Sequence, residues 1–242
     1  MSLRAMLQGP LPVTAPLVLN PLMAKLAEAA GFPAGYLGGG ATGYQKVALE
    51  ANLNLTEMCQ AALDIRAVSS LPLILDAACG YGDPMHLHRT IGMSEAAGFA
   101  AIELEDQLVP KRAHHHIGIE HMIPMELMAA KVKEAVAARR SPGFLIVART
   151  NAMRASTMED ALRCGEAYRK AGADVVLLSM AHKPERLRAI AERLGGPLMY
   201  LTSRGGLAGL GMTLRDLGGL GYDPPPSCPH FHSYPPGQNF SA

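Results

Sequence analysis

Three side chains at the ends of consecutive apolar runs are the best placed for chemistry. Asp76 and Glu105 end two of these runs, and Arg149 ends the next one along the chain. If the runs are parallel strands, their ends lie at one edge of the sheet and the two carboxylates face one hollow. The carboxylates then repel each other unless a cation lies between them, and carboxylate oxygens with water are what Mg²⁺ prefers. The arginine adds a planar fork suited to a carboxylate or phosphonate.

Glycines follow an earlier apolar run in the same way. Gly38, Gly39 and Gly40 come directly after residues 35–37. Without side chains, their backbone N–H groups can approach an anionic substrate closely. Together these features describe a metal-bound small carboxylic acid. The residues also allow a plainer interpretation, in which the two carboxylates cap the following loops and the arginine only neutralises them.

Histidines cluster in one segment, at His114, His115, His116 and His121. The spacing lacks HExxH and the segment contains glycine, so a zinc site is not favoured. Solvated loop histidines explain the pattern better. The alternative is that one of them transfers a proton when the loop closes, and His115 is our candidate for that proton donor.

Composition excludes several classes of protein. Of 242 residues, 49% are hydrophobic, and 22 basic against 21 acidic residues give a net charge of +1. Such a balance argues against nucleic-acid binding and disorder. No apolar run is long enough for a membrane span, and the N-terminus lacks a signal-peptide core. The four cysteines, at 59, 79, 164 and 228, form no CxxC motif, which indicates free thiols and a cytoplasmic location.

The elements that must position these residues follow from periodicity. Continuous apolar runs, typical of parallel strands buried on both faces, alternate with amphipathic segments. We expect strands at 17–19, 35–37, 72–76, 100–104, 144–148, 174–178 and 197–201, and helices at 21–30, 55–68, 85–97, 125–139, 157–171 and 185–194. This rhythm predicts a (β/α)₈ TIM-type barrel. A doubly wound sheet is the alternative, but no GxGxxG follows the first strand.

Local signals agree with this assignment. Asn20 before Pro21 and Asp83 before Pro84 are typical helix starts, and residues 156–159 match a capping box. A left-handed glycine is expected after three helices, at Gly31, Gly98 and Gly172. Seven units can be counted up to residue 222, which we take as the barrel domain. Residues 223–242 are Pro-rich, so the eighth unit is expected to be missing or replaced by an irregular tail.

Four segments, in this order and spacing, resemble the isocitrate lyase / phosphoenolpyruvate mutase superfamily. They are residues 73–82, 102–107 with 110–112, 148–151 and 171–174, and the likeness runs from about residue 15 to 222. The resemblance implies a (β/α)₈ barrel, Mg²⁺ (or Mn²⁺) and homo-tetramers that exchange C-terminal helices. It also implies 2-oxo or 2-hydroxy acid substrates, cleaved or rearranged at a C–C or C–P bond through a metal-held enolate.

The resemblance also assigns metal-site roles. Asp76 looks like the direct metal ligand, and Glu105 looks like the carboxylate that holds metal-bound water. Glu50 is the nearest match to a further acidic residue of the family. The family's second aspartate, two residues after the first, is replaced here by Ala78.

Substrate roles are carried over in the same way. Arg149 looks like the substrate anchor, and Gly38 and Gly39 match the backbone that grips the substrate carboxylate, with Gly40 and Tyr36 beside them. Lys111 begins the segment that resembles the gating loop, and we count it among the catalytic residues. Lyases of the family carry a catalytic cysteine where this chain has Ala113.

These assignments predict a Mg²⁺-dependent carbon–carbon lyase, similar to an oxaloacetate decarboxylase, but not a typical isocitrate lyase. Decarboxylation needs an electron sink and no cysteine acid, so it tolerates Ala113. One alternative is phosphonopyruvate mutase or hydrolase chemistry, with Arg149 holding the phosphonyl group. Another is a catalytically impaired barrel that only binds a carboxylate. The expected partner is a small carboxylic acid, with no nucleic acid and no membrane, and a homo-oligomer is expected.

Overall fold

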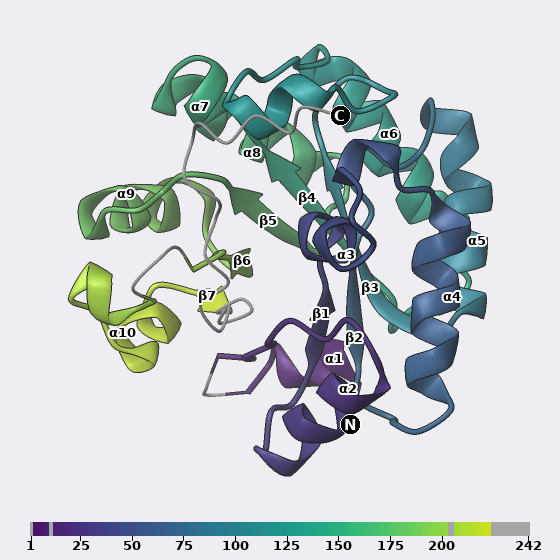
Figure 1. Cartoon of the computed structure of the whole chain (residues 1–242). Coiled ribbons are helices and arrows are strands. Elements are labelled where there is room, and N and C mark those ends of the chain that lie inside the picture. The colour runs from purple at the N-terminus through teal and green to yellow at the C-terminus, as the bar shows by residue number, and fades with distance from the viewer. Residues whose placement is uncertain (1, 10–11, 203–205, 224–242) are drawn as a thin grey trace.

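The computed structural model describes residues 2–9, 12–202 and 206–223. Its sheet has seven strands, each parallel to and hydrogen-bonded with the next along the chain, and helices lie around it (Figure 1). The strands are β1 (Gly35–Leu37), β2 (Leu73–Asp76), β3 (Phe99–Glu105), β4 (Leu145–Thr150), β5 (Val175–Leu178), β6 (Leu198–Met199) and β7 (Tyr222–Asp223). This strand–helix order confirms the predicted TIM-type α/β architecture.

The two ends of the predicted strand set need correction. The expected strand 17–19 is reduced to one parallel bridge between Leu17 and Tyr36. At the other end we expected no strand after residue 201, yet β7 pairs in parallel with β6. A further strand position is therefore present just before the Pro-rich segment. The proposed tail loses residue 223 to β7, and its remainder, 224–242, lies outside the described residues.

Helices follow the predicted pattern closely. All six predicted helices are present with ends within two residues of the expected ones. The helices are α1 (Leu3–Met6), α2 (Pro21–Ala29), α3 (Gly39–Gln45), α4 (Leu55–Arg66), α5 (Leu87–Ala96), α6 (Met125–Ala138), α7 (Ala152–Ala155), α8 (Met158–Lys170), α9 (Pro184–Leu194) and α10 (Leu214–Gly219). Short 3₁₀ turns lie at η1 (Glu50–Asn52), η2 (Pro84–His86), η3 (Ala113–Ile117) and η4 (Ala208–Leu210). Among the described residues, no helix is long and apolar enough to cross a membrane.

Local signals explain most of these boundaries. The Asn20 side chain accepts from the Met23 N–H at the start of α2, and Asp83 caps η2, as predicted. The capping box at 156–159 is wrong by one residue, because Thr157 caps α8 and accepts from the Asp160 N–H. Three glycines after helices have the left-handed φ values expected, +78° at Gly31, +84° at Gly98 and +107° at Gly172.

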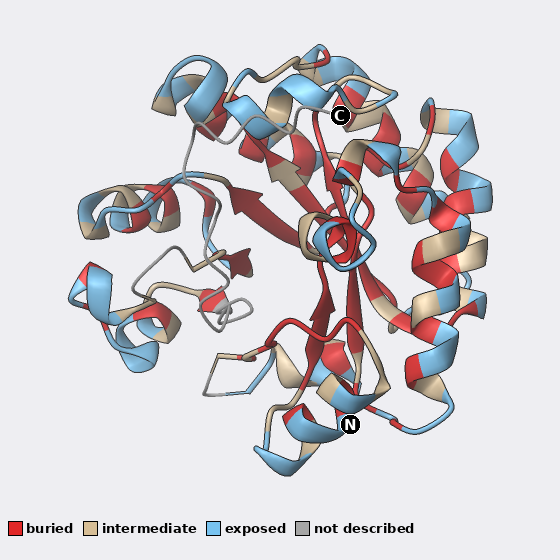
Figure 2. Ribbon diagram, in the orientation of Figure 1, coloured by how far each residue is buried: buried red, intermediate tan, exposed pale blue. Residues whose placement is uncertain are grey.

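The core lies along the sheet, where nearly every strand residue is buried (Figure 2). Leu, Ile, Val and Ala supply most of it, as expected for strands covered on both faces. Polar side chains nevertheless lie buried at the carboxyl ends of the central strands, among them Asp76, Glu103, Glu105 and Thr150. Because buried charges need partners, these strand ends mark the place to search for a functional site.

Candidate functional site

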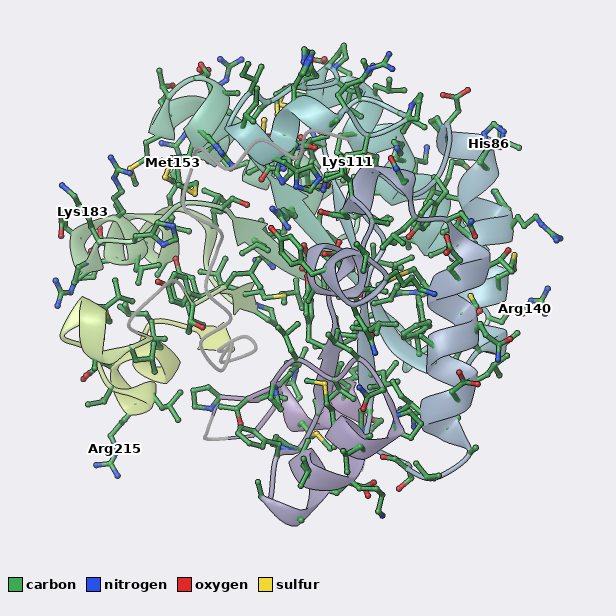
Figure 3. The ribbon with its side chains drawn as sticks, in the orientation of Figure 1. His86, Lys111, Arg140, Met153, Lys183 and Arg215 are labelled. Atoms are coloured by element: carbon green, nitrogen blue, oxygen red, sulfur yellow. The ribbon has the colours of Figure 1, made fainter. Side chains whose placement is uncertain are left out.

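A lysine joins two of the predicted acidic residues. The Lys111 ammonium donates to Glu50 Oε1 at 2.6 Å and also to Glu105 Oε1. Its side chain is 5% exposed, and Figure 3 labels Lys111 in the upper half of the view, near the ends of the central strands. Lys111 comes from the β3–α6 loop (residues 106–124), so the fold of this loop decides whether the cation reaches the carboxylates. A cation therefore lies between two residues that we predicted to serve a metal.

Asp76 lies at the end of β2, held by backbone N–H groups. Its carboxylate accepts from Gly39 N at 2.9 Å and from Ala78 N at 3.1 Å. A side chain at residue 39 would place its Cβ only 2.9 Å from Glu50 Oε1, so this close approach requires glycine. The predicted glycines follow β1 as expected and begin helix α3, with Gly38 as its N-cap residue. In the described structure the Gly39 N–H serves Asp76, which was not foreseen.

Arg149, at the end of β4, forms a second cluster. Its Nη1 donates to Glu103 Oε1 at 3.0 Å, and its Nε lies 3.5 Å from Glu105 Oε2. Nε also donates to Ser179 Oγ at 2.9 Å and to Asn151 Oδ1 at 3.3 Å. Because Glu105 contacts both Arg149 and Lys111, it links the two clusters into one network.

Two further side chains complete the buried network. The Tyr36 hydroxyl donates to Glu103 Oε2 at 2.9 Å, and Asn151 Nδ2 donates to Glu105 Oε2 at 2.8 Å. Glu103 and Glu105 are each 1% exposed. The predicted residues Tyr36, Glu50, Asp76, Glu105, Lys111 and Arg149 thus gather at one end of the sheet.

The pKa shifts express this crowding of charge. Burial alone would raise the pKa of Glu105, but the Arg149 and Lys111 cations lower it to about 2. Burial raises the pKa of Glu50 to about 7, helped by Asp76 and opposed by Lys111. Burial likewise raises the pKa of Glu103 to about 7, opposed chiefly by Arg149. Glu105 is therefore firmly ionised, whereas Glu50 and Glu103 take up protons near neutral pH.

The donor set can be tested against a metal ion. Within the described residues, no group of three or more His, Cys, Asp or Glu side chains is arranged to hold one. Mg²⁺, however, usually binds through one or two carboxylates and keeps several waters, so it does not need such a cage. Asp76 and Glu105 supply hard oxygen ligands, and the Lys111 ammonium already lies where positive charge is favoured. The chemistry of these side chains therefore fits Mg²⁺.

The histidines lie apart from this network. His115 Nδ1 contacts Gln107 Nε2 at 2.9 Å and the Glu120 carboxylate at 3.0 Å. Glu120 is also paired with Arg154 at 3.1 Å, which ties the β3–α6 loop to α7. No hydrogen bond joins His115 to Glu105 or Lys111 in the described structure, so its catalytic role stays a prediction.

His114 and His121 share a hydrogen bond of 2.9 Å at the surface, as expected of loop histidines. The cysteines Cys59, Cys79 and Cys164 are free, whereas Cys228 lies outside the described residues.

Sequence reasoning gave no role to several supporting residues, although some of them stand at the predicted strand ends. Glu103 and Asn151 contact the network directly, and Asp106 accepts from Tyr168 Oη at 2.7 Å and from the Asn151 N–H at 3.0 Å. Glu103 had a signal, because residues two apart on a strand share a face and Glu105 was already assigned. The Asp106 to Tyr168 bond spans 62 residues and had no such signal.

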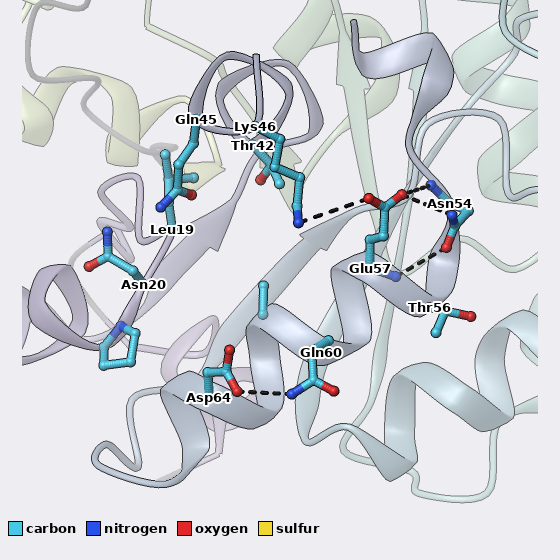
Figure 4. Close-up of a pocket in the computed structure, with 12 residues that line it drawn as sticks. Leu19, Asn20, Thr42, Gln45, Lys46, Asn54, Thr56, Glu57, Gln60 and Asp64 are labelled. Atoms are coloured by element: carbon cyan, nitrogen blue, oxygen red, sulfur yellow. Dashed lines mark hydrogen bonds and ion pairs between the residues drawn. The ribbon is translucent and has the colours of Figure 1, made fainter. Parts of the chain in front are cut away.

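A separate groove of about 790 Å³ lies where α2, α3 and α4 meet (Figure 4). None of the predicted site residues lines it. Its charged side chains are satisfied by neighbours, since Lys46 pairs with Glu57 at 3.9 Å and Gln60 donates to Asp64 at 2.9 Å. The strand ends therefore remain the candidate active site.

Comparison with known proteins gives consistent matches. The family model described as phosphoenolpyruvate phosphomutase matches residues 3–223. A 2,3-dimethylmalate lyase of Eubacterium barkeri is 35% identical over 217 residues, covering 87% of this chain and 73% of that protein. An oxaloacetate decarboxylase of Pseudomonas putida is 37% identical over 187 residues, covering 76% of this chain and 64% of that protein.

Solved structures agree with the sequence matches. A phosphonopyruvate hydrolase in complex with oxalate and Mg²⁺ superposes with a TM-score of 0.81 at 30% identity, covering 93% of this chain and 78% of that one. The chain spans 60–73% of the length of the first curated relatives that it matches. Since the family model covers almost the whole described barrel, the chain belongs to the phosphoenolpyruvate phosphomutase family, within the PEP mutase/isocitrate lyase superfamily.

Proposed function

We propose that this chain is a Mg²⁺-dependent carbon–carbon lyase that decarboxylates a small 2-oxo dicarboxylic acid of oxaloacetate type. The observation that carries the proposal is the single buried network of Glu50, Lys111, Glu105 and Arg149. It brings carboxylates suited to a cation next to an arginine suited to a substrate carboxylate. Relatives named as lyases and oxaloacetate decarboxylases support the reaction class.

Each side chain has a role in this proposal. Asp76 and Glu105 hold the metal, with Glu50 as a further carboxylate beyond them. When bound, Mg²⁺ supplies a Lewis acid that polarises the 2-oxo group of the substrate. Arg149 anchors a substrate carboxylate, and the backbone of Gly38, Gly39 and Gly40 lies beside that carboxylate. The Lys111 ammonium must move away from Glu50 and Glu105 before a metal cation can bind their oxygens, because the ammonium and the cation cannot occupy the same place.

Proton delivery completes the reaction. Loss of CO₂ leaves the electron pair of the broken C–C bond on the pyruvate skeleton, which must then gain a proton at C3. His115 is the proposed donor, through Nε2, because Gln107 and Glu120 occupy Nδ1. No cysteine acid is required, which accords with Ala113.

The test is a comparison of substrates with and without metal. We expect the full chain with Mg²⁺ or Mn²⁺ to release pyruvate from oxaloacetate faster than metal alone does, and Arg149→Lys to abolish most of that gain. Faster release from phosphonopyruvate than from oxaloacetate favours the phosphonate alternative. If calorimetry detects no Mg²⁺ binding and oxaloacetate decays no faster with protein, the enzyme proposal fails and a carboxylate-binding barrel remains.

Assembly and location remain part of the proposal. We propose a homo-oligomer in the cytoplasm, with no nucleic-acid partner. Sedimentation of the purified chain tests the first point, and a single monomeric boundary at micromolar concentration contradicts it.

A further inference from the structure

Glu103 is a buried carboxylate of the candidate site, and the proposed reaction assigns it no role. It lies on β3 two residues before Glu105, so both side chains are on the same face of the strand. Its two oxygens are fully engaged, Oε1 by Arg149 Nη1 at 3.0 Å and Oε2 by the Tyr36 hydroxyl at 2.9 Å. A carboxylate with only 1% exposure is costly to keep, which calls for a functional reason.

The first consequence concerns the donors of Arg149. Glu103 engages Nη1, and Ser179 and Asn151 engage Nε. Nη2 is the guanidinium nitrogen that donates to no partner in the described part of the chain. Glu103, Ser179 and Asn151 therefore take up part of the donor capacity of Arg149, and fewer N–H groups are left for a substrate anion. A carboxylate, with two oxygens, needs fewer of these remaining N–H groups than a phosphonate with three oxygens.

The second consequence concerns charge. Glu50, Asp76, Glu103 and Glu105 supply four negative charges when all are ionised, and Lys111 and Arg149, which contact three of them, supply two positive ones. Two negative charges are left over, which one divalent cation balances. With a neutral side chain at residue 103, the same loaded site carries one positive charge instead. Glu103 thus removes the excess positive charge that would draw a highly charged anion to Arg149.

We propose that Glu103 is a specificity-determining residue that selects a singly charged carboxylate, rather than a doubly charged phosphonate, at Arg149. This inference rests on the proposed function, since it assumes that Arg149 holds one end of the substrate. It deepens that function by naming the substrate class, a dicarboxylate and not a phosphonocarboxylate.

The test uses two probes that differ only in the terminal group, succinate and 3-phosphonopropionate. Calorimetric titrations of the Mg²⁺-loaded full chain are run at about pH 9, because the second pKa of a phosphonate lies above that of a phosphate and the probe must carry nearly two charges on its phosphonate group. We expect Glu103→Gln to raise the affinity for 3-phosphonopropionate about tenfold more than that for succinate. Glu103→Asp keeps the charge, so its ratio of the two dissociation constants is expected to stay like that of the unmodified chain.

Each outcome decides the inference. A ratio unchanged within about twofold in Glu103→Gln overturns it, and so does an equal shift in Glu103→Asp, because shape rather than charge then sets the ratio. If Glu103→Gln does not fold, as judged by thermal melting, the comparison between Glu103→Asp and Tyr36→Phe replaces it. Tyr36→Phe removes a hydrogen bond that stabilises the ionised form of Glu103 and therefore weakens the negative charge there. It is expected to raise the affinity for 3-phosphonopropionate relative to that for succinate, and no change there contradicts the inference. Binding of neither probe overturns the proposed function together with the inference, whereas binding with an unchanged ratio overturns the inference alone.

Discussion

Replacing Lys111 with methionine removes the cation that joins Glu50 to Glu105. The ammonium is 5% exposed and the two carboxylates are 8% and 1% exposed, so water cannot replace the lost partner. Breaking a buried ion pair by removing one partner costs about 3–5 kcal/mol. For a domain of this size, about 2–4 °C is lost per kcal/mol, so Lys111→Met is expected to melt roughly 6–20 °C lower without metal.

Added Mg²⁺ is expected to reverse much of that loss. In the unmodified chain the metal must displace the Lys111 ammonium from Glu105, whereas in Lys111→Met the carboxylate oxygens lack that competitor. The variant therefore binds Mg²⁺ more tightly, and its melting temperature rises more on addition of metal. A ligand present at about 100 times its dissociation constant stabilises by about 2.7 kcal/mol, which is large enough to measure.

Differential scanning calorimetry with and without Mg²⁺ measures both effects. Lys133→Met is the matched control, because Lys133 is an exposed lysine on α6 and its loss is expected to leave both melting temperatures unchanged. The reasoning is refuted if Lys111→Met melts within about 2 °C of the unmodified chain. It is also refuted if Mg²⁺ shifts both proteins equally.

Three further predictions test other parts of the site. Burial raises the pKa of Glu103 from 4.5 to about 7, so between these pH values the folded chain binds a proton that the unfolded chain has lost. The free energy of unfolding is therefore expected to fall by about 3 kcal/mol as the pH rises from about 4.5 to about 7. Glu103→Gln is expected to flatten that part of the profile in urea unfolding, and an unaltered slope contradicts this. Tyr168→Phe removes the donor to Asp106 Oδ2, whereas the Asn151 N–H still donates to Oδ1. The loss should cost about 1–3 kcal/mol in the same assay and lower pyruvate release. Ala78→Asp adds a carboxylate two residues after Asp76. Residue 78 has a left-handed backbone (φ +46°), which Asp tolerates better than Ala. Because a second carboxylate adds an oxygen ligand, calorimetry should show about tenfold tighter Mg²⁺ binding.

The fold could be predicted wherever one local signal dominates. β1 and the start of α2 follow directly from an apolar run and from the Asn20 cap. Helix α3 could not be predicted, because three of its seven residues are glycine, a poor helix former. It forms in its tertiary setting, where the Thr42 hydroxyl donates to the Gly38 carbonyl and the Gly39 N–H reaches Asp76.

In the candidate site too, only some of the contacts could be predicted from the sequence. Asp76, Glu105 and Arg149 could be brought together from the sequence, because parallel strands present their ends at one edge. The pairing of Lys111 with Glu50 spans 61 residues and depends on how the β3–α6 loop folds. No periodicity encodes such a contact. The position of Glu103 in the site could have been predicted, because it shares a strand face with Glu105. Its contacts with Arg149 and Tyr36 could not, because they depend on how the strands are placed.

Lys111 and Glu103 act on the same charge balance from opposite sides. Lys111 neutralises a carboxylate, that of Glu105, to which a divalent cation would otherwise bind. Glu103 neutralises Arg149, to which an anion would otherwise bind. Removing Lys111 should therefore favour cation binding, and removing the charge of Glu103 should favour anion binding. Glu105 contacts both Lys111 and Arg149, so the two effects must couple through it. A double variant whose Mg²⁺ and phosphonate affinities are both simple products of the single changes would show that Glu105 does not link the two halves of the site.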